Sequence, residues 1–188
     1  MSLQVIILAA GKGTRMKSDL AKVLHKVNGR PMVDYVLDTA QSLNPENIYL
    51  VIGHQAEEVR KVTSNYKVNY VEQKEQLGTG HAVMVVEPAL KTRTGTTIIL
   101  CGDVPLLKTA TIQKLLSHHR GQKAVATILT IRLADPKHYG RICRSVNGDV
   151  EKIVEYRDAN ESERALNEIN SGIYAFETAD LFNSLSKL

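Results

Sequence analysis

A basic, glycine-containing segment near the N-terminus has the composition of a phosphate-binding loop. Residues 8–16 read LAAGKGTRM and come directly after a short apolar run. Small residues let backbone N–H groups approach an anion, and nearby cations would balance the charge of a triphosphate. Those cations are Lys12, Arg15, Lys17 and Lys22. The alternative interpretation is a tight turn followed by a solvated basic loop, because glycine is a common turn residue.

Two standard phosphate motifs fail at the same position of this segment. The Walker loop requires a glycine five positions after Gly11, where the chain has Met16. The dinucleotide fingerprint G-x-G-x-x-G matches at Gly11 and Gly13 but also requires glycine at position 16. A phosphate loop of another kind is therefore expected.

A single carboxylate follows a second apolar run. Residues 97–101 are followed by Gly102, Asp103, Val104 and Pro105, so Asp103 is expected at the tip of a strand. Magnesium binds few protein carboxylates together with phosphate oxygens and water, so one aspartate beside a phosphate loop is a plausible metal site. The alternative is an aspartate that begins a turn before Pro105.

A polar loop at residues 73–82, QKEQLGTGHA, could contact a nucleobase. Gln73 and Gln76 each offer a donor and an acceptor, as the edge of a base requires, and Gly78 would allow a ligand close to the backbone. The alternative is a flexible loop in which Thr79 caps a helix over 79–86. Further along, Glu155 and the segment 170–172 could bind sugar hydroxyls or satisfy backbone groups at a sheet edge.

Strand-like apolar runs alternate with helical patterns over the first two thirds of the chain. Strands are predicted at 4–8, 48–52, 68–71, 97–101 and 124–131, and apolar helix faces at 32–43 and 112–116. This alternation favours a doubly wound, mostly parallel sheet with helices on both faces. Ligands bind such sheets beyond the carboxyl ends of the strands, so the loops after Leu8 and Cys101 are expected at one crevice. Shorter strands, expected to extend the sheet or cover its end, are predicted at 140–144, 150–155 and 168–176.

Composition bounds the class of protein. A chain of 188 residues fits one domain, and its 43% apolar and 23% charged residues are typical of globular proteins. A membrane partner is not expected, because no stretch approaches the roughly 20 apolar residues of a spanning helix. The net charge of +4 could mean a nucleic-acid surface, but the basic residues are spread along the chain, and a polyanionic small molecule as partner explains the charge as well. Without a secretory signal, the expected location is cytoplasmic, with Cys101 and Cys143 as thiols.

Seven segments in order resemble one enzyme family. They read LAAGKGTRM, KVLHKVNGRPM, EQLGTGHA, CGDVPL, YGRI, IVEYRDA and EINSGIYAF. Together they are similar to the nucleotidyltransferase region of the N-acetylglucosamine-1-phosphate uridyltransferase family, over nearly the whole chain. The first segment alone would indicate only the wider superfamily of sugar-phosphate nucleotidyltransferases. The resemblance implies a Rossmann-like α/β fold with a mostly parallel mixed sheet.

The resemblance also implies roles for individual residues. Arg15 and Lys22 would contact the phosphates as catalytic residues, and Asp103 would be a catalytic ligand of Mg²⁺. The nucleotide would be held by Leu8, Ala9, Ala10, Gly11, Lys22, Gln73, Gly78 and Thr79. The sugar phosphate would be held by Thr79, Gly140, Glu155 and Asn170.

The reaction implied by the resemblance joins UTP and N-acetylglucosamine 1-phosphate. Its products are UDP-N-acetylglucosamine, a precursor of peptidoglycan and lipopolysaccharide, and pyrophosphate. Two other hypotheses for the function stay open: a different sugar-1-phosphate nucleotidyltransferase, or a fragment that binds a uridine nucleotide without turnover.

The sequence departs from the family pattern in two ways, and both affect which properties of the family can be expected of this chain. Position 21 is alanine, where the family commonly has proline before the lysine. The family region also continues past residue 188, where it supplies an asparagine as second magnesium ligand and leads into a β-helical acetyltransferase domain that builds trimers. Residues 1–188 are therefore expected to be one nucleotidyltransferase domain, incomplete at its C-terminus and without the β-helix.

Overall fold

The computed structural model describes residues 2–13, 16–90 and 92–187. The chain forms two compact units: the first contains Met1–Thr127 and Tyr174–Leu188, and the second contains Ile128–Ile173. Among the described residues, no helix has both the length and the apolar character to cross a membrane. The two strands that contribute residues to both units are β7 (Ala126–Arg132) and β10 (Glu168–Glu177).

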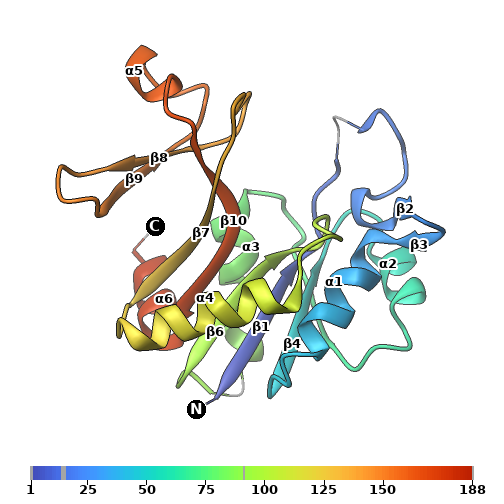
Figure 1. Cartoon of the computed structure of the whole chain (residues 1–188). Helices are drawn as coiled ribbons and strands as arrows, with labels where there is room; N and C mark the ends of the chain where they lie inside the picture. The colour runs from blue at the N-terminus through green and yellow to red at the C-terminus, as the bar shows by residue number, and fades with distance from the viewer. Residues whose placement is uncertain (1, 14–15, 91, 188) are drawn as a thin grey trace. The chain divides into compact units, whose positions relative to one another are not determined.

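A parallel sheet forms the centre of the first unit (Figure 1). Its strands lie in the order β5–β4–β1–β6, and β10 adds antiparallel to β6 through Tyr174 to Glu177. The middle strands are buried on both faces, which explains why their apolar residues run without alternation. The bounds are β1 (Leu3–Leu8), β4 (Asn47–Ile52), β5 (Asn69–Glu72) and β6 (Thr96–Cys101).

Helices cover both faces of this sheet. In Figure 1, α1 (Met32–Gln41) and α4 (Thr109–Gly121) lie on one side, and α3 (Thr79–Met84) and α6 (Thr178–Leu185) lie on the other. The core beneath α3 and α6 joins apolar residues of the sheet to those of this helical layer: Ile6, Tyr49, Val51, Ala82, Val83, Val86, Ile99, Leu181 and Phe182. The doubly wound class predicted from the sequence is confirmed.

Short elements connect the layers of the first unit. A 3-10 helix at Lys22–Leu24 precedes a small hairpin of β2 (Lys26–Val27) and β3 (Arg30–Pro31). The helix α2 (Ala56–Val62) follows β4. The fully buried ring of His119 lies 2.8 Å from Thr127 Oγ1 and 3.2 Å from Glu177 Oε1, and these contacts connect α4 to β7 and β10.

The second unit is a β structure with one short helix. The strands β8 (Arg141–Arg144) and β9 (Val150–Val154) form an antiparallel hairpin, and β8 pairs with β10 at Ile169. The helix α5 (Glu161–Arg164) begins at a capping box: Asn160 Oδ1 accepts from the Glu163 N–H, and Glu163 Oε2 accepts from the Asn160 N–H.

Most predicted strands lie within two residues of their observed bounds, but two details differ. The helix predicted over 79–86 ends at Met84, because a 3-10 turn containing Pro88 follows at Glu87–Ala89. The helices α2 and α5 have no counterpart in the sequence prediction. Both are at most seven residues long, so neither gives a clear helical period.

Candidate functional site

The loops after β1, β4 and β6 meet at the carboxyl ends of these strands. The Ala9 N–H donates to Val51 O (2.8 Å), the Gly102 N–H donates to Leu8 O (2.9 Å), and the His54 N–H donates to Ala10 O (3.2 Å). The chain order reverses at β1, since β4 and β5 lie on one side and β6 on the other. Such a reversal is where doubly wound sheets bind their ligands.

Gly53 and Gly102 allow these loops to lie close together, and neither was predicted to be a site residue. A Cβ on Gly53 would lie 2.9 Å from Ala10 Cβ and 3.0 Å from Gln73 O. A Cβ on Gly102 would lie 3.1 Å from Leu8 O. The signal was present in the sequence, because each glycine directly follows a buried strand.

Lys22 and Asp103 form an ion pair at this edge of the sheet. The Lys22 ammonium contacts Asp103 Oδ2, and the side chains are 35% and 24% exposed, so solvent and ligands can reach both. Gly13, at a φ of +63°, lies against the lysine: a Cβ there would be 2.6 Å from Lys22 Cβ. The phosphate-loop glycine therefore makes room for the lysine.

Cys101 ends β6 beside the ion pair. Burial raises the pKa of its thiol to about 11; the Asp103 charge adds to the rise and the Lys22 charge opposes it. The thiol is therefore protonated at neutral pH, which does not suit a nucleophile. Cys101 and Cys143, both among the described residues, form no disulfide, as expected from the sequence.

The residues at this edge fit a magnesium ion bound jointly with a substrate. Asp103 supplies a reachable carboxylate, the kind of oxygen donor that Mg²⁺ takes in small number beside phosphate and water. Within the described parts of the chain, no three His, Cys, Asp or Glu side chains gather as a metal site. A cation at Asp103 would therefore rely on substrate oxygens, and it would compete with the Lys22 ammonium.

The remaining residues of the predicted phosphate loop are only partly placed. Arg15 lies outside the described residues. Gly11 is exposed, and nothing lies within 4 Å of the position of a Cβ there, so its backbone is open to a ligand. Ala9 and Ala10 are buried beneath it.

Gln73 lies inside the polar loop and holds it together. The residue is 3% exposed, its Nε2 donates to Gly78 O (3.1 Å), and the same nitrogen lies 3.0 Å from His81 Nδ1. Gly78, with a φ of +105°, is the N-cap of α3, so Thr79 is the first helical residue and not the cap. Gly78 and Thr79 are both exposed.

Three of the four residues predicted for the sugar phosphate lie together in the second unit. The Asn170 N–H donates to Gly140 O (2.9 Å), and a Cβ on Gly140 would lie 3.2 Å from Glu155 Oε1. Glu155 is exposed, and Asn170 Oδ1 accepts from the Gly172 N–H (3.0 Å). The fourth residue, Thr79, belongs to the first unit.

Arg141 fixes the backbone next to Gly140, a role that sequence analysis missed. The residue is 2% exposed, and its guanidinium donates to main-chain carbonyls of Lys137 (2.9 Å), Tyr139 and Arg164 (3.3 Å). It therefore joins the loop before β8 to the end of α5. An arginine in a strand is usually exposed, so its type gave no signal of burial.

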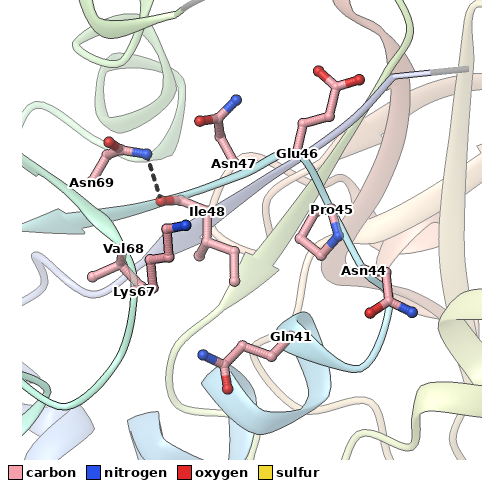
Figure 2. A pocket seen from close by; sticks show the side chains of 9 residues that line it. All are labelled: Gln41, Asn44, Pro45, Glu46, Asn47, Ile48, Lys67, Val68 and Asn69. Carbon is pink, nitrogen blue, oxygen red and sulfur yellow. Dashed lines mark hydrogen bonds between the residues drawn. The ribbon is translucent and has the colours of Figure 1, made fainter.

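The cavity in Figure 2 lies at the opposite end of the parallel strands. Its volume is about 430 Å³, and it is lined where β4 and β5 begin, by residues that include Asn47, Ile48 and Asn69. The Asn69 side chain donates to Ile48 O (3.3 Å), as Figure 2 shows. None of the catalytic, metal-binding, nucleotide-binding or sugar-phosphate-binding residues predicted from the sequence is among those that line this cavity.

The fold has counterparts among solved structures. A UDP-glucose pyrophosphorylase complexed with UDP-glucose superposes with a TM-score of 0.79 at 20% identity, over 100% of this chain and 80% of that one. HddC from Yersinia pseudotuberculosis, complexed with GMP-PN, gives a TM-score of 0.73 at 21% identity, over 96% of this chain and 79% of that one. At these identities, the likeness concerns the fold.

Sequence comparison gives nearer relatives. The chain is 50% identical over 183 residues to the bifunctional protein GlmU of Shouchella clausii (strain KSM-K16), covering 97% of this chain and 40% of that protein. It is 49% identical over 188 residues to the bifunctional protein GlmU of Streptococcus gordonii, covering 100% of this chain and 41% of that protein. The chain thus spans about 40% of the length of these relatives.

A family model gives the assignment. The model of the MobA-like NTP transferase domain matches residues 5–168, which include the loops after β1, β4 and β6 and the hairpin of the second unit. The resemblance to a nucleotidyltransferase family, found in the sequence motifs, is confirmed by this match and by the similarity to the GlmU proteins. The chain belongs to the family of MobA-like NTP transferase domains.

Proposed function

We propose that the chain transfers the uridylyl group of UTP to N-acetylglucosamine 1-phosphate, giving UDP-N-acetylglucosamine and pyrophosphate. The observation that carries the proposal is the pair of Lys22 and Asp103 at the reversal of strand order, beside a phosphate loop with open backbone at Gly11. The seven sequence motifs and the whole-chain similarity to GlmU proteins support this choice of substrates.

The chemistry is an in-line displacement at the α-phosphorus of UTP. An oxygen of the sugar phosphate forms the new P–O bond, the bond to the bridging α,β-oxygen breaks, and pyrophosphate leaves with the electron pair. The attacking group is already an anion, so no side chain has to act as its base. The protein contributes position and charge, which is consistent with the protonated Cys101 and the basic phosphate loop.

Lys22 is proposed to stabilise charge on the transferring phosphates, with Arg15 on the same segment facing the departing pyrophosphate. In the structure the Lys22 ammonium neutralises Asp103. When a substrate phosphate is bound, the flexible lysine side chain can turn from the carboxylate to the phosphate. Asp103 would then hold Mg²⁺, which when bound neutralises phosphate charge and aligns the phosphates.

The second unit is proposed to hold the sugar phosphate through Gly140, Glu155 and Asn170. Glu155 is exposed and can accept from sugar hydroxyls, and the lack of a side chain on Gly140 leaves room for the Glu155 carboxylate, which a Cβ there would meet at 3.2 Å. Thr79 is proposed to serve both substrates, and Leu8 to Gly11, Gln73 and Gly78 to hold the uridine. Residues 1–188 are proposed to belong to one nucleotidyltransferase domain, with a cytoplasmic location.

Pyrophosphate release tests the proposal directly. With Mg²⁺, the chain should release pyrophosphate only when UTP and N-acetylglucosamine 1-phosphate are both present, and Asp103→Asn should abolish release with little change in the unfolding midpoint. Preference for another nucleoside triphosphate or sugar phosphate would replace the proposed substrates. Binding of UTP without release would identify a uridine-binding module and contradict the transferase.

A further inference from the structure

The segment that leads into Lys22 is fastened to the loop after β4 by one short hydrogen bond. The Ala21 N–H donates to Gln55 Oε1 at 2.7 Å, across 34 positions of sequence. Ala21 has no exposed surface, so water cannot replace this acceptor without rearrangement. A buried N–H left without a partner costs free energy, so the acceptor matters to the conformation of the segment.

Gln55 is itself held in an unusual backbone conformation. Its φ is +53° and its ψ is +44°, the left-handed region, at the N-cap of α2. A glutamine rarely adopts this region, and its cost is met here by the structure around it. The Val59 N–H donates to Gln55 O (3.1 Å), which anchors the residue to the helix. The side chain is thus carried by a rigid element and reaches back to residue 21.

The neighbouring residue of the same loop adds a second link to this segment. His54 Nε2 lies 3.4 Å from Asp19 O, while the His54 N–H donates to Ala10 O (3.2 Å) in the phosphate loop. The loop after β4 therefore contacts the phosphate loop on one side and the segment before Lys22 on the other. Sequence analysis assigned no role to this loop.

We propose that Gln55 is a positioning residue that holds Lys22 against Asp103 by fixing the backbone of Ala21. Lysine has a long side chain with large rotamer freedom, so its ammonium stays beside one carboxylate only if its backbone is fixed. Residue 21 directly precedes the 3-10 helix that begins at Lys22, so a change at residue 21 moves the base of the lysine. The effect on turnover rests on the proposed function, whereas the effect on the Lys22–Asp103 pair does not.

The conformation of Ala21 supplies a sharp test. Its φ of −51° and ψ of 133° are compatible with proline, which restricts φ covalently but has no N–H to donate. If Gln55 acts through the Ala21 N–H, then replacing Gln55 should matter only while residue 21 is a donor. In the Ala21→Pro background, the same replacement should cost nothing, because the ring supplies the restraint and the Gln55 amide, which has to turn away from the ring, no longer has an N–H from which to accept.

The pair can be measured without turnover by zero-length cross-linking. A carbodiimide activates the Asp103 carboxylate, the Lys22 amine attacks it, and an amide forms with release of the urea, which mass spectrometry of the digested chain detects. Gln55→Met keeps the length of the side chain but removes the acceptor. We expect a fall of about 2- to 10-fold in the initial rate of this cross-link, the range that the net value of one hydrogen bond allows. Gln113→Met, at an exposed glutamine of α4, is the control and should leave the rate unchanged.

The double variant shows whether Gln55 acts through the N–H of residue 21 or in some other way on the fold. We expect Ala21→Pro with Gln55→Met to cross-link as fast as Ala21→Pro alone. An unchanged rate in Gln55→Met, or an equal fall in both backgrounds, would overturn the role of Gln55. The unfolding midpoint of each variant shows whether it folds. If Gln55→Met alone fails to fold, the comparison of Ala21→Pro with and without Gln55→Met still measures whether Gln55 acts through residue 21.

Kinetics then connect the pair to the proposed reaction. Gln55→Met should lower kcat for pyrophosphate release by a factor similar to the cross-linking rate, with little change in KM for UTP, because the lysine charge matters most in the transition state. A wild-type chain that cross-links but releases no pyrophosphate would contradict the proposed function and leave the positioning role intact. An active Gln55→Met variant with normal kcat and slowed cross-linking would contradict the link to turnover.

Discussion

The ammonium of Lys22 is paired with the carboxylate of Asp103 at the carboxyl end of β6. A lysine therefore neutralises the carboxylate that we propose as a magnesium ligand. Two cations cannot share this position without repulsion, so a metal ion at Asp103 would compete with the lysine. Such competition would favour arrival of the metal together with phosphate, which offers the lysine a new partner.

Removing the lysine should expose the carboxylate to metal. In the absence of nucleotide, Lys22→Met should bind Mn²⁺ about 10-fold more tightly than the wild-type chain, the order of effect of one nearby charge at a half-exposed site. Electron paramagnetic resonance of free Mn²⁺ measures this affinity. Lys12→Met, which removes a charge from the same loop and leaves the pair intact, should have a much smaller effect. Equal affinities of Lys22→Met and wild type would show that the lysine does not compete.

A side chain on Gly53 should disturb the predicted nucleotide loop. The added Cβ of Gly53→Ala would lie 2.9 Å from Ala10 Cβ and 3.0 Å from Gln73 O, closer than unstrained contacts. We expect a loss of about 1–3 kcal/mol in the free energy of unfolding and a higher KM for UTP, because both neighbours are in the proposed uridine site. Chemical denaturation and steady-state kinetics measure the two effects.

The matched control is Gly121→Ala at the end of α4, where nothing lies within 4 Å of the added Cβ. This variant should keep the wild-type KM for UTP and should be no less stable than the wild type, because alanine has a higher helix propensity than glycine. A Gly53→Ala variant with normal stability would mean that the loops after β1 and β4 can separate at no cost.

Arg141 should be irreplaceable by lysine, although the charge is kept. A lysine cannot reproduce a planar fork that donates to carbonyls of residues 137, 139 and 164. We expect Arg141→Lys to destabilise the second unit by about 2–4 kcal/mol and to raise KM for the sugar phosphate more than KM for UTP. Hydrogen exchange of amides in residues 128–173 and a two-substrate kinetic analysis measure this. Arg157→Lys, at a side chain that is 86% exposed, should behave as wild type.

Stability of the second unit should depend on pH through Glu168. The Arg144 guanidinium donates to both carboxylate oxygens (2.6 and 2.9 Å) and, against the opposing effect of burial, lowers the pKa of Glu168 from 4.5 to about 2. Because the folded pKa is the lower one, the contribution is complete above pH 4.5 and is lost as pH falls toward 2.

Glu168→Gln removes this contribution. At pH 7 the variant should lose about 2 kcal/mol in the free energy of unfolding, allowing for solvent around the partly exposed Arg144. The difference from wild type should shrink between pH 4.5 and pH 2, as urea unfolding followed by circular dichroism would show. Glu151→Gln, at an exposed position of β9, is the control. A difference that stayed constant with pH would exclude the ion pair as its cause.

Local patterns allowed much of this molecule to be predicted. The unbroken apolar runs of β1, β4 and β6 gave the strands, since strands of a parallel sheet are buried on both faces. The apolar stripe after Pro31 gave α1. Asp103 was placed at the tip of β6 because it comes two positions after such a run, and the sequence motifs led to the correct family.

Other features could not be derived from local sequence. The contacts of the Gln73 Nε2 with Gly78 and His81 inside the loop could not be foreseen from the residue type. The helices α2 and α5 are too short to show a period. The roles of Gly53 and Gln55 depend on neighbours 20 or more positions away, so their own sequence context contains no sign of them.

The sequence by itself determined the alternation of strands and helices, the position of the basic loop after β1 and of the carboxylate after β6, and the family. These follow from residue type and spacing over a few positions. Only the tertiary structure decided that Lys22 pairs with Asp103, that Gln55 binds Ala21, and that Arg141 is buried among main-chain carbonyls. Those contacts depend on the strand order β5–β4–β1–β6 and on the closing of loops between distant residues, which hydrophobic periodicity does not specify.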